Sequence, residues 1–307
     1  MTEKGAYTNL RSKEKQEVKM VTIQDQRNTG IGATDAAVVL GHSPWRTPLD
    51  LYLEKTGQKD DFHPSERMEW GILLEPVIAK EYCERTDRKF VQMGNRFRRH
   101  PEKEFMIAHL DRVIEDTDRG TGLLEIKTTS AFNKKDWEIE PPVYYQIQLQ
   151  HQLAITGHDW GAIVVLIGGQ ELVYQDMPRN DRLIEHLEDE EAAFWRNVQD
   201  RRPPAVDYER DTENLKKLHE AKRNSTIELP ADAHQWKREI DSAAQVVKQQ
   251  KAHQQRYRNM IIDHLHGCDS GVIPGGGTVT YKPITRRGYT SKDTTYQQLN
   301  FQKGGKR

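Results

Sequence analysis

The sequence predicts a mixed α/β fold, in which a central mixed β-sheet is flanked by helices and followed by a long helix and a β-hairpin. Three observations support this prediction. The spacing of apolar residues changes from a period of about 3.6 to a period of about 2 near Lys89. Residues 162–167 (AIVVLI) form a continuous apolar run, typical of a strand buried on both faces. After Asp207 the chain becomes more basic and polar, so a separate C-terminal extension is expected at 208–307.

Residues 1–24 are polar and lack a clear period, so we expect a flexible segment before a domain at 25–207. The first helix is expected to open at Thr34 or Asp35, which are both good N-caps, while the glycines before it allow close backbone approach. Pro76 is expected to kink or restart the helix predicted at 65–85. Apolar residues at steps of three and four predict helices at 35–40, 47–55, 65–85, 143–156 and 179–199.

Alternating apolar residues and turn clusters predict the strands of the same domain. The turn cluster DTDRGTG at 116–122 joins two of them, so Asp111 and Glu125 are expected on strands joined by one connection. The predicted strands are Lys89–Phe97, Phe105–Glu115, Leu123–Thr129, Ala162–Ile167 and Leu172–Met177.

Composition excludes several classes of protein. No apolar run approaches the ~18 to 20 residues of a membrane span, and the first residues lack the apolar core of a secretory signal. Cys83 and Cys268 are the only cysteines among 307 residues, which excludes disulfide scaffolds, four-cysteine zinc sites and iron–sulfur clusters. We therefore expect a soluble protein of a reducing compartment, the cytoplasm.

The net charge of −1 hides an uneven distribution. Residues 208–307 contain 18 Lys and Arg against 11 Asp and Glu, a net charge of +7, whereas residues 1–207 carry a net charge of −8. This asymmetry favours a polyanion partner at the basic end, where Arg286 and Arg287 are possible DNA contacts. A solvated tail is the alternative interpretation.

The residues most indicative of chemistry are Asp111 and the tripeptide Glu125-Ile126-Lys127. In a strand Glu125 and Lys127 project to one face, while Ile126 points into the core. Two carboxylates crowded there repel each other unless a cation such as Mg²⁺ or Mn²⁺ binds, and the Ile126 carbonyl offers a further oxygen ligand. Such a site is suited to phosphodiester hydrolysis, with Lys127 orienting the water or stabilising charge. The alternative is an exposed strand with cross-strand ion pairs.

These residues form part of four ordered motifs that together resemble the lambda-exonuclease-like, or YqaJ-type, viral recombination nucleases of the PD-(D/E)xK nuclease fold. The resemblance extends over residues 26–207, about two-thirds of the chain. Leu110 stands where proline is common in the superfamily. The motifs are RNTGIGATD at 27–35, Trp70-Gly71 with Glu75, Asp111 with Glu125-Ile126-Lys127, and YQIQLQ at 145–150 with Thr156-Gly157.

The resemblance implies a role for each matching residue. Asp111, Glu125 and the Ile126 carbonyl would be metal ligands, and Lys127 would be the catalytic lysine. Glu75 would hold or orient a second ion or its water, and Gln148 would lie near the lysine and the attacking water. For Glu75 and Gln148 the alternative is an ordinary polar residue on a helix surface.

The resemblance also assigns Arg27 and Thr34 to a pocket for a DNA 5′-phosphate. A guanidinium and a hydroxyl at a helix start suit an anion, and Thr34 keeps the hydroxyl of the serine that is usual in the family. His109 shares a predicted face with Asp111 and is a possible DNA contact, although a packed or solvated histidine is the preferred interpretation. Trp45 is a possible stacking surface for a terminal base, but a core tryptophan is preferred.

In the extension, residues 230–266 predict a long polar helix and residues 271–283 a glycine-turn hairpin. The apolar seam of the helix becomes polar in its middle, which favours a short antiparallel packing or a partner contact over a long coiled coil. DNA guiding, oligomer contacts and docking of an annealing protein remain open as roles. The seam residues are Trp236, Ile240, Ala243, Val247, Gln254, Tyr257 and Ile261.

The resemblance implies an Mg²⁺-dependent exonuclease with two ions, Mn²⁺ being an alternative metal. It would degrade one strand of linear double-stranded DNA from 5′ to 3′, release mononucleotides and leave a 3′ overhang for a single-strand annealing protein. A ring-shaped trimer and a phage, prophage or mobile-element setting in a bacterial host are also implied. The alternatives are a PD-(D/E)xK endonuclease of restriction or nicking type and a non-catalytic protein that binds DNA ends.

Overall fold

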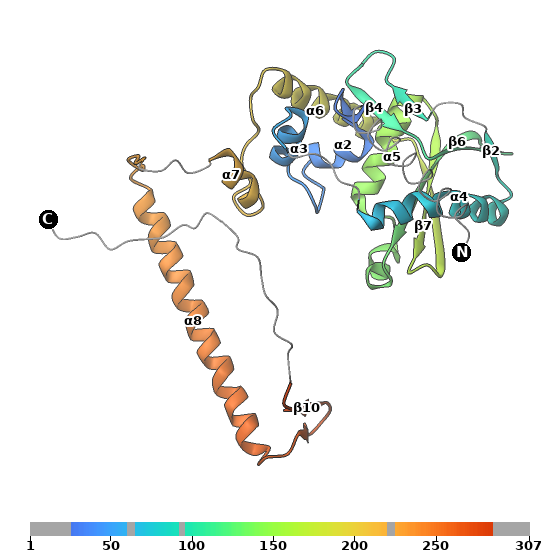
Figure 1. The fold of residues 1–307 in the computed structure, drawn as a ribbon. Helices are drawn as coiled ribbons and strands as arrows, with labels where there is room; N and C mark the ends of the chain where they lie inside the picture. The colour runs from blue at the N-terminus through green and yellow to red at the C-terminus, as the bar shows by residue number, and fades with distance from the viewer. Residues whose placement is uncertain (1–25, 60–64, 92–95, 220–224, 285–307) are drawn as a thin grey trace, which may run out of the picture. The chain divides into compact units, whose positions relative to one another are not determined.

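The computed structural model describes residues 26–59, 65–91, 96–219 and 225–284, which form two units divided after Leu218 (Figure 1). The first unit extends past the predicted boundary at Asp207 because the following residues bind back to it. The Thr47 hydroxyl donates to the Asp211 carboxylate, and the Arg210 guanidinium donates to the carbonyl of Ser43 at 2.8 Å. The predicted flexible segment at 1–24 and the possible DNA contacts Arg286 and Arg287 lie outside the described residues.

A mixed five-stranded sheet lies at the centre of the first unit, in the order β2-β5-β6-β7-β8. β6 and β7 are parallel, whereas the other neighbouring pairs are antiparallel. The mixed sheet flanked by helices is therefore confirmed. The strands are β2 (Lys89–Val91), β5 (Arg112–Asp116), β6 (Gly120–Thr129), β7 (Trp160–Ile167) and β8 (Glu171–Pro178).

A smaller sheet has the order β1-β4-β3, with β1 at Ile31–Gly32, β4 at Met106–His109 and β3 at Phe97–Arg99. The prediction of one strand over Phe105–Glu115 was wrong, because β4 and β5 belong to different sheets and Asp111 lies between them. The pairing of β5 with β6 ends at Arg112 and Leu124. One residue beyond, the Asp111 carboxylate accepts a hydrogen bond from the Ile126 N–H at 2.8 Å, in place of a backbone carbonyl.

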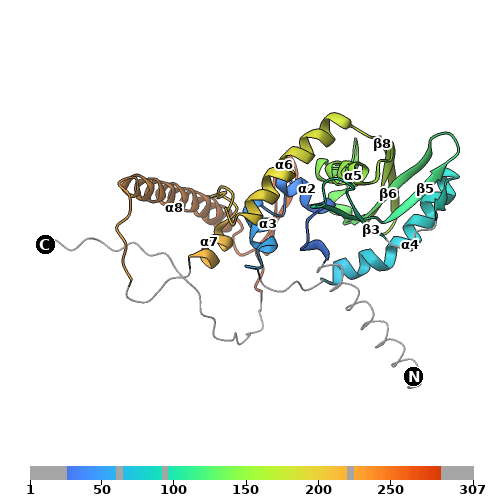
Figure 2. The same ribbon diagram turned by 90° about the horizontal axis from the view of Figure 1, so that it is seen from above.

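Helices cover both faces of the central sheet (Figures 1 and 2). α4 (Glu66–Thr86) packs on the face that presents Leu124 and Ile126. α5 (Val143–Thr156) packs on the opposite face, against Leu123, Ile163 and Val165. α2 (Ala33–Val39) and α6 (Asp181–Gln199) contact α5 on that side. α4 continues through Pro76 as one helix, so a restart at the proline was wrong.

The start of α2 differs from the prediction, because its N-cap is Gly32 and not Thr34 or Asp35. Asp35 lies at the third helical position, where its carboxylate accepts the Gly32 N–H at 3.1 Å, as in a capping box. The close backbone approach expected at Gly30 is confirmed, since a Cβ atom there would overlap the carbonyl oxygen of Phe105. The remaining short helices of this unit are α3 (Pro48–Lys55), the 3₁₀ helix η1 (Ala131–Trp137) and α7 (Thr212–Leu218).

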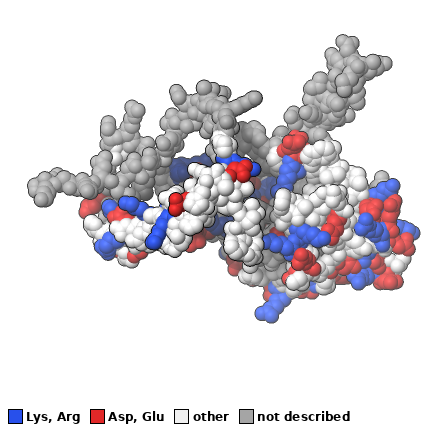
Figure 3. Space-filling view, turned by 90° about the horizontal axis from the view of Figure 1, so that it is seen from below, with Lys and Arg blue, Asp and Glu red and all other residues white. Residues whose placement is uncertain are grey.

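Acidic and basic side chains are interspersed on the face of the first unit that Figure 3 displays. Ion pairs also occur elsewhere in the first unit, where Arg88 contacts Asp116 at 2.8 Å and Asp176 at 2.5 Å. The acidic excess of residues 1–207 therefore does not form one continuous patch on that face.

The second unit consists of α8 (Ala233–His264) and an antiparallel hairpin of β9 (Ser270–Val272) and β10 (Thr278–Thr280). The predicted long helix and hairpin are thus confirmed. No side chain of α8 is buried, and Trp236 and Ile261 of its seam are both exposed. Among the described residues, no helix has the length and apolar character needed to cross a membrane.

Candidate active site

Strand β6 places an acid and a base side by side. Glu125 and Lys127 project to the face that α5 covers, and the ammonium of Lys127 lies 2.6 Å from Oε1 of Glu125. Glu125 is only 2% exposed, and Ile126 between them packs on the opposite face with α4. The predicted shared direction of Glu125 and Lys127 is therefore confirmed. Burial disfavours the charged amine, but the carboxylates of Glu125 and Asp111 outweigh it and raise the pKa of Lys127, so the ammonium persists.

Two glutamines of α5 hold the Glu125 carboxylate in place. The side-chain amide of Gln148 donates to Oε1 at 2.5 Å, and the amide of Gln152 donates to Oε2 at 2.6 Å. The Lys127 ammonium in turn donates to Oε1 of Gln148 at 3.1 Å. Gln148 therefore lies beside the lysine, as predicted, and is buried. Gln152 was missed, although its spacing of four residues from Gln148 on a helix was a usable signal.

The Asp111 carboxylate lies at the junction of β4 and β5. The carboxylates near it outweigh the one ammonium, that of Lys127, that stabilises its negative charge. Burial, followed by the neighbouring carboxylates of Glu125 and Glu75, raises the pKa of Asp111 well above its usual range. The Lys127 ammonium and the Ile126 N–H act in the opposite direction but do not outweigh these effects. An additional cation would stabilise the charged carboxylate.

The oxygen donors present fit a hard divalent cation. Mg²⁺ in proteins typically binds one or two carboxylates together with phosphate and water oxygens, and Asp111 and Glu125 supply two carboxylates. The crowding that raises the pKa of Asp111 shows that the arrangement favours added positive charge. Within the ranges that the structure describes, no group of three or more His, Cys, Asp and Glu side chains is arranged to hold a metal ion. The metal site at Asp111, Glu125 and the Ile126 carbonyl stays a prediction.

Glu75 lies on α4, close enough to influence the pKa of Asp111, but its carboxylate is engaged elsewhere. Oε1 of Glu75 lies 2.7 Å from Arg96 and also contacts the Arg112 guanidinium. A role for Glu75 beside a second ion stays a prediction, and it requires these arginines to give way.

Arg27 and Thr34 meet at the start of α2, where the Arg27 guanidinium donates to the Thr34 hydroxyl at 2.7 Å. Behind them lies the fully buried Asp35, with the ammonium of Lys55 at 2.7 Å and the guanidinium of Arg46 at 3.3 Å. Burial alone would raise the pKa of Asp35, but Lys55, Arg27 and Arg46 outweigh it and hold that pKa well below its usual range.

This network was missed because Arg46 and Lys55 lie outside the motif that contains Arg27 and Thr34. Asp35 is the last residue of that motif. An acidic residue directly after a predicted anion site was therefore the available signal for a network of compensating cations. Arg46 also pairs with Asp50 and Glu54, and Lys59 pairs with Asp50, so four cations face three carboxylates. The excess of one positive charge, with Arg27 on the pocket wall, suits an anion.

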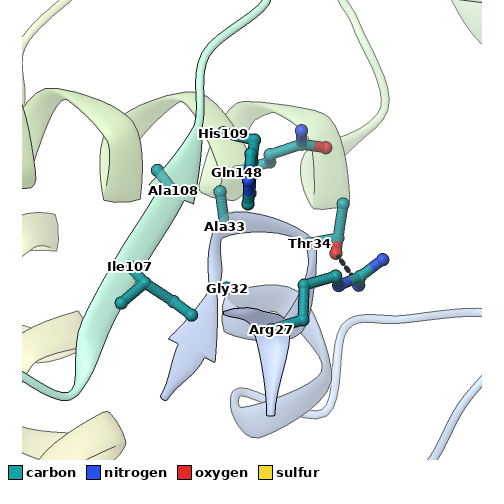
Figure 4. A pocket seen from close by; sticks show the side chains of 8 residues that line it. All are labelled: Arg27, Gly32, Ala33, Thr34, Ile107, Ala108, His109 and Gln148. Carbon is teal, nitrogen blue, oxygen red and sulfur yellow. Dashed lines mark hydrogen bonds between the residues drawn. The ribbon is translucent and has the colours of Figure 1, made fainter. Parts of the chain in front are cut away.

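A pocket of about 110 Å³ lies beside the start of α2 (Figure 4). Arg27 and Thr34 lie on one side of it, and His109 and Gln148 lie on another. The pocket is large enough for a few water molecules or a small anion. Because Gln148 also binds Glu125 and Lys127, the predicted phosphate pocket lies next to the acid–lysine cluster of Glu125 and Lys127, with Gln148 between them.

His109 lines this pocket but is also packed. Its Nε2 lies 2.8 Å from Oε1 of Gln26, and its ring lies 5.1 Å from the ring of Phe97. Burial, and then the nearby Arg27 guanidinium, lowers the pKa of His109, so the imidazole is neutral at pH 7. The preferred interpretation of a packed histidine agrees with these contacts, and a DNA contact stays a prediction.

Trp45 is not a core residue, so that preferred interpretation was wrong. The side chain is 66% exposed and its ring lies 4.7 Å from the ring of Tyr144. Tyr144 and its neighbour Tyr145 extend these ring contacts toward Lys127, whose ammonium lies 4.7 Å from the centre of the Tyr145 ring.

Comparison with known proteins identifies the class to which the chain belongs. Residues 23–159 match the family described as the YqaJ-like viral recombinase domain. The chain is also 34% identical, over 266 residues, to the protein YqaJ of Bacillus subtilis (strain 168), in an alignment that covers 84% of this chain and 82% of that protein. The chain therefore belongs to the YqaJ-like viral recombinase family, and the family predicted from the four motifs is confirmed.

Two solved structures are similar at lower levels. The alkaline exonuclease LHK-Exo from Laribacter hongkongensis is 21% identical with a TM-score of 0.47, and the match covers 63% of this chain and 97% of that chain. A phage-related exonuclease from Haemophilus somnus 129PT is 13% identical with a TM-score of 0.40, and the match covers 58% of this chain and 97% of that chain.

Proposed function

We propose that this protein is a metal-dependent exonuclease that degrades one strand of linear double-stranded DNA from its 5′ end and leaves 3′ overhangs. The observation that carries the proposal is the position of Gln148. This residue lines a pocket with Arg27 and Thr34 and also binds Glu125 and Lys127 directly. Gln148 thus links a pocket lined by an anion-binding group to a neighbouring group suited to phosphodiester hydrolysis.

Asp111, Glu125 and the Ile126 carbonyl would hold Mg²⁺, with Mn²⁺ as an alternative, and Glu75 is the candidate for a second ion. When bound, the metal polarises the attacked phosphate and lowers the pKa of a water. Lys127 carries a positive charge beside the metal ligands and stabilises negative charge that develops on the phosphate. Gln148 fixes the positions of both Glu125 and Lys127.

The proposed polarity comes from the family resemblance, and the Arg27 guanidinium on the wall of the pocket supports it. A terminal 5′-phosphate bound by Arg27 and Thr34 would position the next phosphodiester bond of the same strand near Lys127. Hydrolysis there releases a mononucleotide and creates a new 5′-phosphate for the following cycle. A terminal phosphate carries about −1.5 to −2 charges at pH 7, against one for an internal phosphodiester, so Arg27 should favour a DNA end.

The overhang would pass to a single-strand annealing protein in recombination, within the cytoplasm of a bacterial host that carries a phage or mobile element. A homo-oligomer, by resemblance a trimeric ring around DNA, would keep the enzyme on its substrate. The exposed seam of α8 is a candidate surface for either protein contact.

The test is digestion of three DNA substrates in Mg²⁺ and in chelator. We expect linear duplex with a 5′-phosphate to be degraded rapidly, the 5′-hydroxyl form more slowly, and supercoiled circular DNA not at all. Absence of degradation of linear duplex with either Mg²⁺ or Mn²⁺ would overturn the proposal in favour of an end-binding protein. Cleavage of the circle would support an endonuclease instead.

A further inference from the structure

We propose that Trp45, supported by Tyr144 and Tyr145, forms a stacking surface for a nucleobase of the strand whose phosphate is attacked. This inference rests on the proposed function, because it assigns a base-binding subsite to the same site. Trp45 is neither a proposed metal ligand nor part of the lining of the phosphate pocket, so the proposed function gives it no role.

The aromatic group has a continuous geometry. Trp45 makes an edge contact with Tyr144, with ring centres 4.7 Å apart, and lies 6.3 Å from the ring of Tyr145. Tyr144 and Tyr145 pack edge to face at 4.5 Å, and Tyr145 stacks on the buried Trp137 at 5.4 Å. The group therefore runs from a buried tryptophan to an exposed one.

The loop that carries Trp45 is held firmly. The Ser43 hydroxyl accepts the N–H groups of Trp45 and Arg46, each at 3.3 Å. The Arg46 guanidinium binds Asp50 at 3.1 Å and Glu54 at 2.6 Å. A base that stacks on Trp45 would therefore meet a surface already in position, with little ordering of the loop on binding.

Most of the Trp45 ring is accessible to a ligand. The side chain is 66% exposed, and unlike the isolated Tyr208 it belongs to a group of packed aromatic rings. One edge of the neighbouring Tyr144 supports the ring, while the exposed part remains available. Aromatic side chains bind successive bases of single strands through stacking, which every base permits because every base has a π-face.

The position of the group favours a base over other occupants. Tyr145 contacts both Trp45 and the Lys127 ammonium, at 6.3 Å and 4.7 Å, so Trp45 lies within about 11 Å of the catalytic lysine. A base resting on Trp45 would thus belong to a nucleotide at or next to the attacked phosphate. The nearby ammonium favours a ligand in which an apolar ring is joined to an anion, as in a nucleotide.

The experiment measures DNA affinity without cleavage, using the full chain with Lys127→Ala in chelator. The ligands are 5′-phosphorylated duplexes, either intact or with one abasic site at the first, second or third nucleotide from the 5′ end. We expect Trp45→Ala to weaken binding of intact DNA about tenfold and Trp45→Phe to weaken it much less. An abasic site at one of the three positions should weaken binding by the parent protein but not by Trp45→Ala.

Tyr208→Ala provides a matched control, because Tyr208 is an aromatic residue that is 84% exposed in the same unit. Its affinity for DNA should equal that of the parent. Unchanged affinity of Trp45→Ala, or equal losses from each abasic site in both proteins, would overturn the stacking proposal. Should Lys127→Ala fail to fold, the Lys127-containing protein in chelator gives the same comparison.

Failure of the stacking proposal can be distinguished from failure of the proposed function. The affinity comparison needs no turnover. If Trp45→Ala weakens binding but the protein degrades no DNA, the nuclease function is refuted and the base subsite is supported. If the protein degrades linear DNA but Trp45→Ala binds it normally, the base subsite is refuted and the nuclease function is supported.

Discussion

The two ends of the site contain the same kind of group, a buried carboxylate, in opposite electrostatic settings. At the β6 end, Asp111 and Glu125 share one ammonium, that of Lys127. At the α2 end, Asp35 alone is surrounded by Arg27, Arg46 and Lys55. Burial opposes ionisation in both places, yet the pKa of Asp111 is raised and the pKa of Asp35 is lowered. Neighbouring charges therefore decide the outcome.

The difference shows which ligand each end favours. The β6 end has more negative than positive charge and is stabilised by an added cation. The α2 end has more positive than negative charge and is stabilised by an added anion. In the proposed function a divalent metal would satisfy the β6 end and a phosphate of DNA the α2 end, and Gln148 contacts both ends.

The largest effect is expected at the β6 end. Lys127→Ala removes the cation that stabilises charge on the attacked phosphate, and we expect the rate on linear duplex to fall about 10³-fold. DNA affinity should change little, because the cations of the α2 end remain. The measurement is the initial rate in Mg²⁺, with Lys80→Ala as a control at a largely exposed lysine of α4. Full activity of Lys127→Ala would refute the assignment.

The α2 end should respond mainly in stability. Asp35→Asn leaves three cations around an uncharged group, and we expect the free energy of unfolding in urea to fall by about 3 kcal/mol. Because the folded pKa of Asp35 lies below its unfolded value of about 3.9, this stabilisation is fully present above that pH and is lost in stronger acid. The difference between the two proteins should therefore be constant from about pH 5 to pH 8 and shrink below about pH 4. A difference that shrinks between pH 8 and pH 5 would contradict the charge assignment.

Arg27→Ala should affect one kind of DNA end. The guanidinium is a partly buried partner of Asp35 at 3.5 Å, and the closer Lys55 and Arg46 remain, so we expect folding to be preserved. The rate on 5′-phosphorylated duplex should fall about tenfold or more, while the rate on 5′-hydroxyl duplex changes little. Equal losses on both substrates would show that Arg27 does not recognise the terminal phosphate.

The smallest effect is expected for Gln152→Leu. The Gln152 amide binds Oε2 of Glu125 but does not line the pocket, whereas Gln148 also binds Lys127. Loss of one hydrogen bond to a buried carboxylate should reduce the rate by about tenfold. Gln148→Leu should reduce it further, and the reverse order would show that contact with Lys127 is unimportant.

The sequence predicted the features that depend on local periodicity. The alternation along 123–129 placed Glu125 and Lys127 on one face and Ile126 on the other, and the four motifs identified Gln148 and the family. It did not predict the break at Asp111, because that break depends on a hydrogen bond to Ile126, fifteen residues away. The Asp35 network likewise depends on Arg46 and Lys55 approaching from a loop and another helix. Trp45 was assigned to the core because most tryptophans are largely buried.

The central claim is that a site for a terminal phosphate, at Arg27 and Thr34, lies next to a hydrolytic cluster and is linked to it through Gln148. The most direct measurement is the ratio of initial rates on 5′-phosphorylated and 5′-hydroxyl linear duplex in Mg²⁺, for the unmodified protein and for Arg27→Ala. We predict a ratio well above one for the unmodified protein and a ratio near one for Arg27→Ala. Equal rates on the two ends in the unmodified protein would contradict the claim.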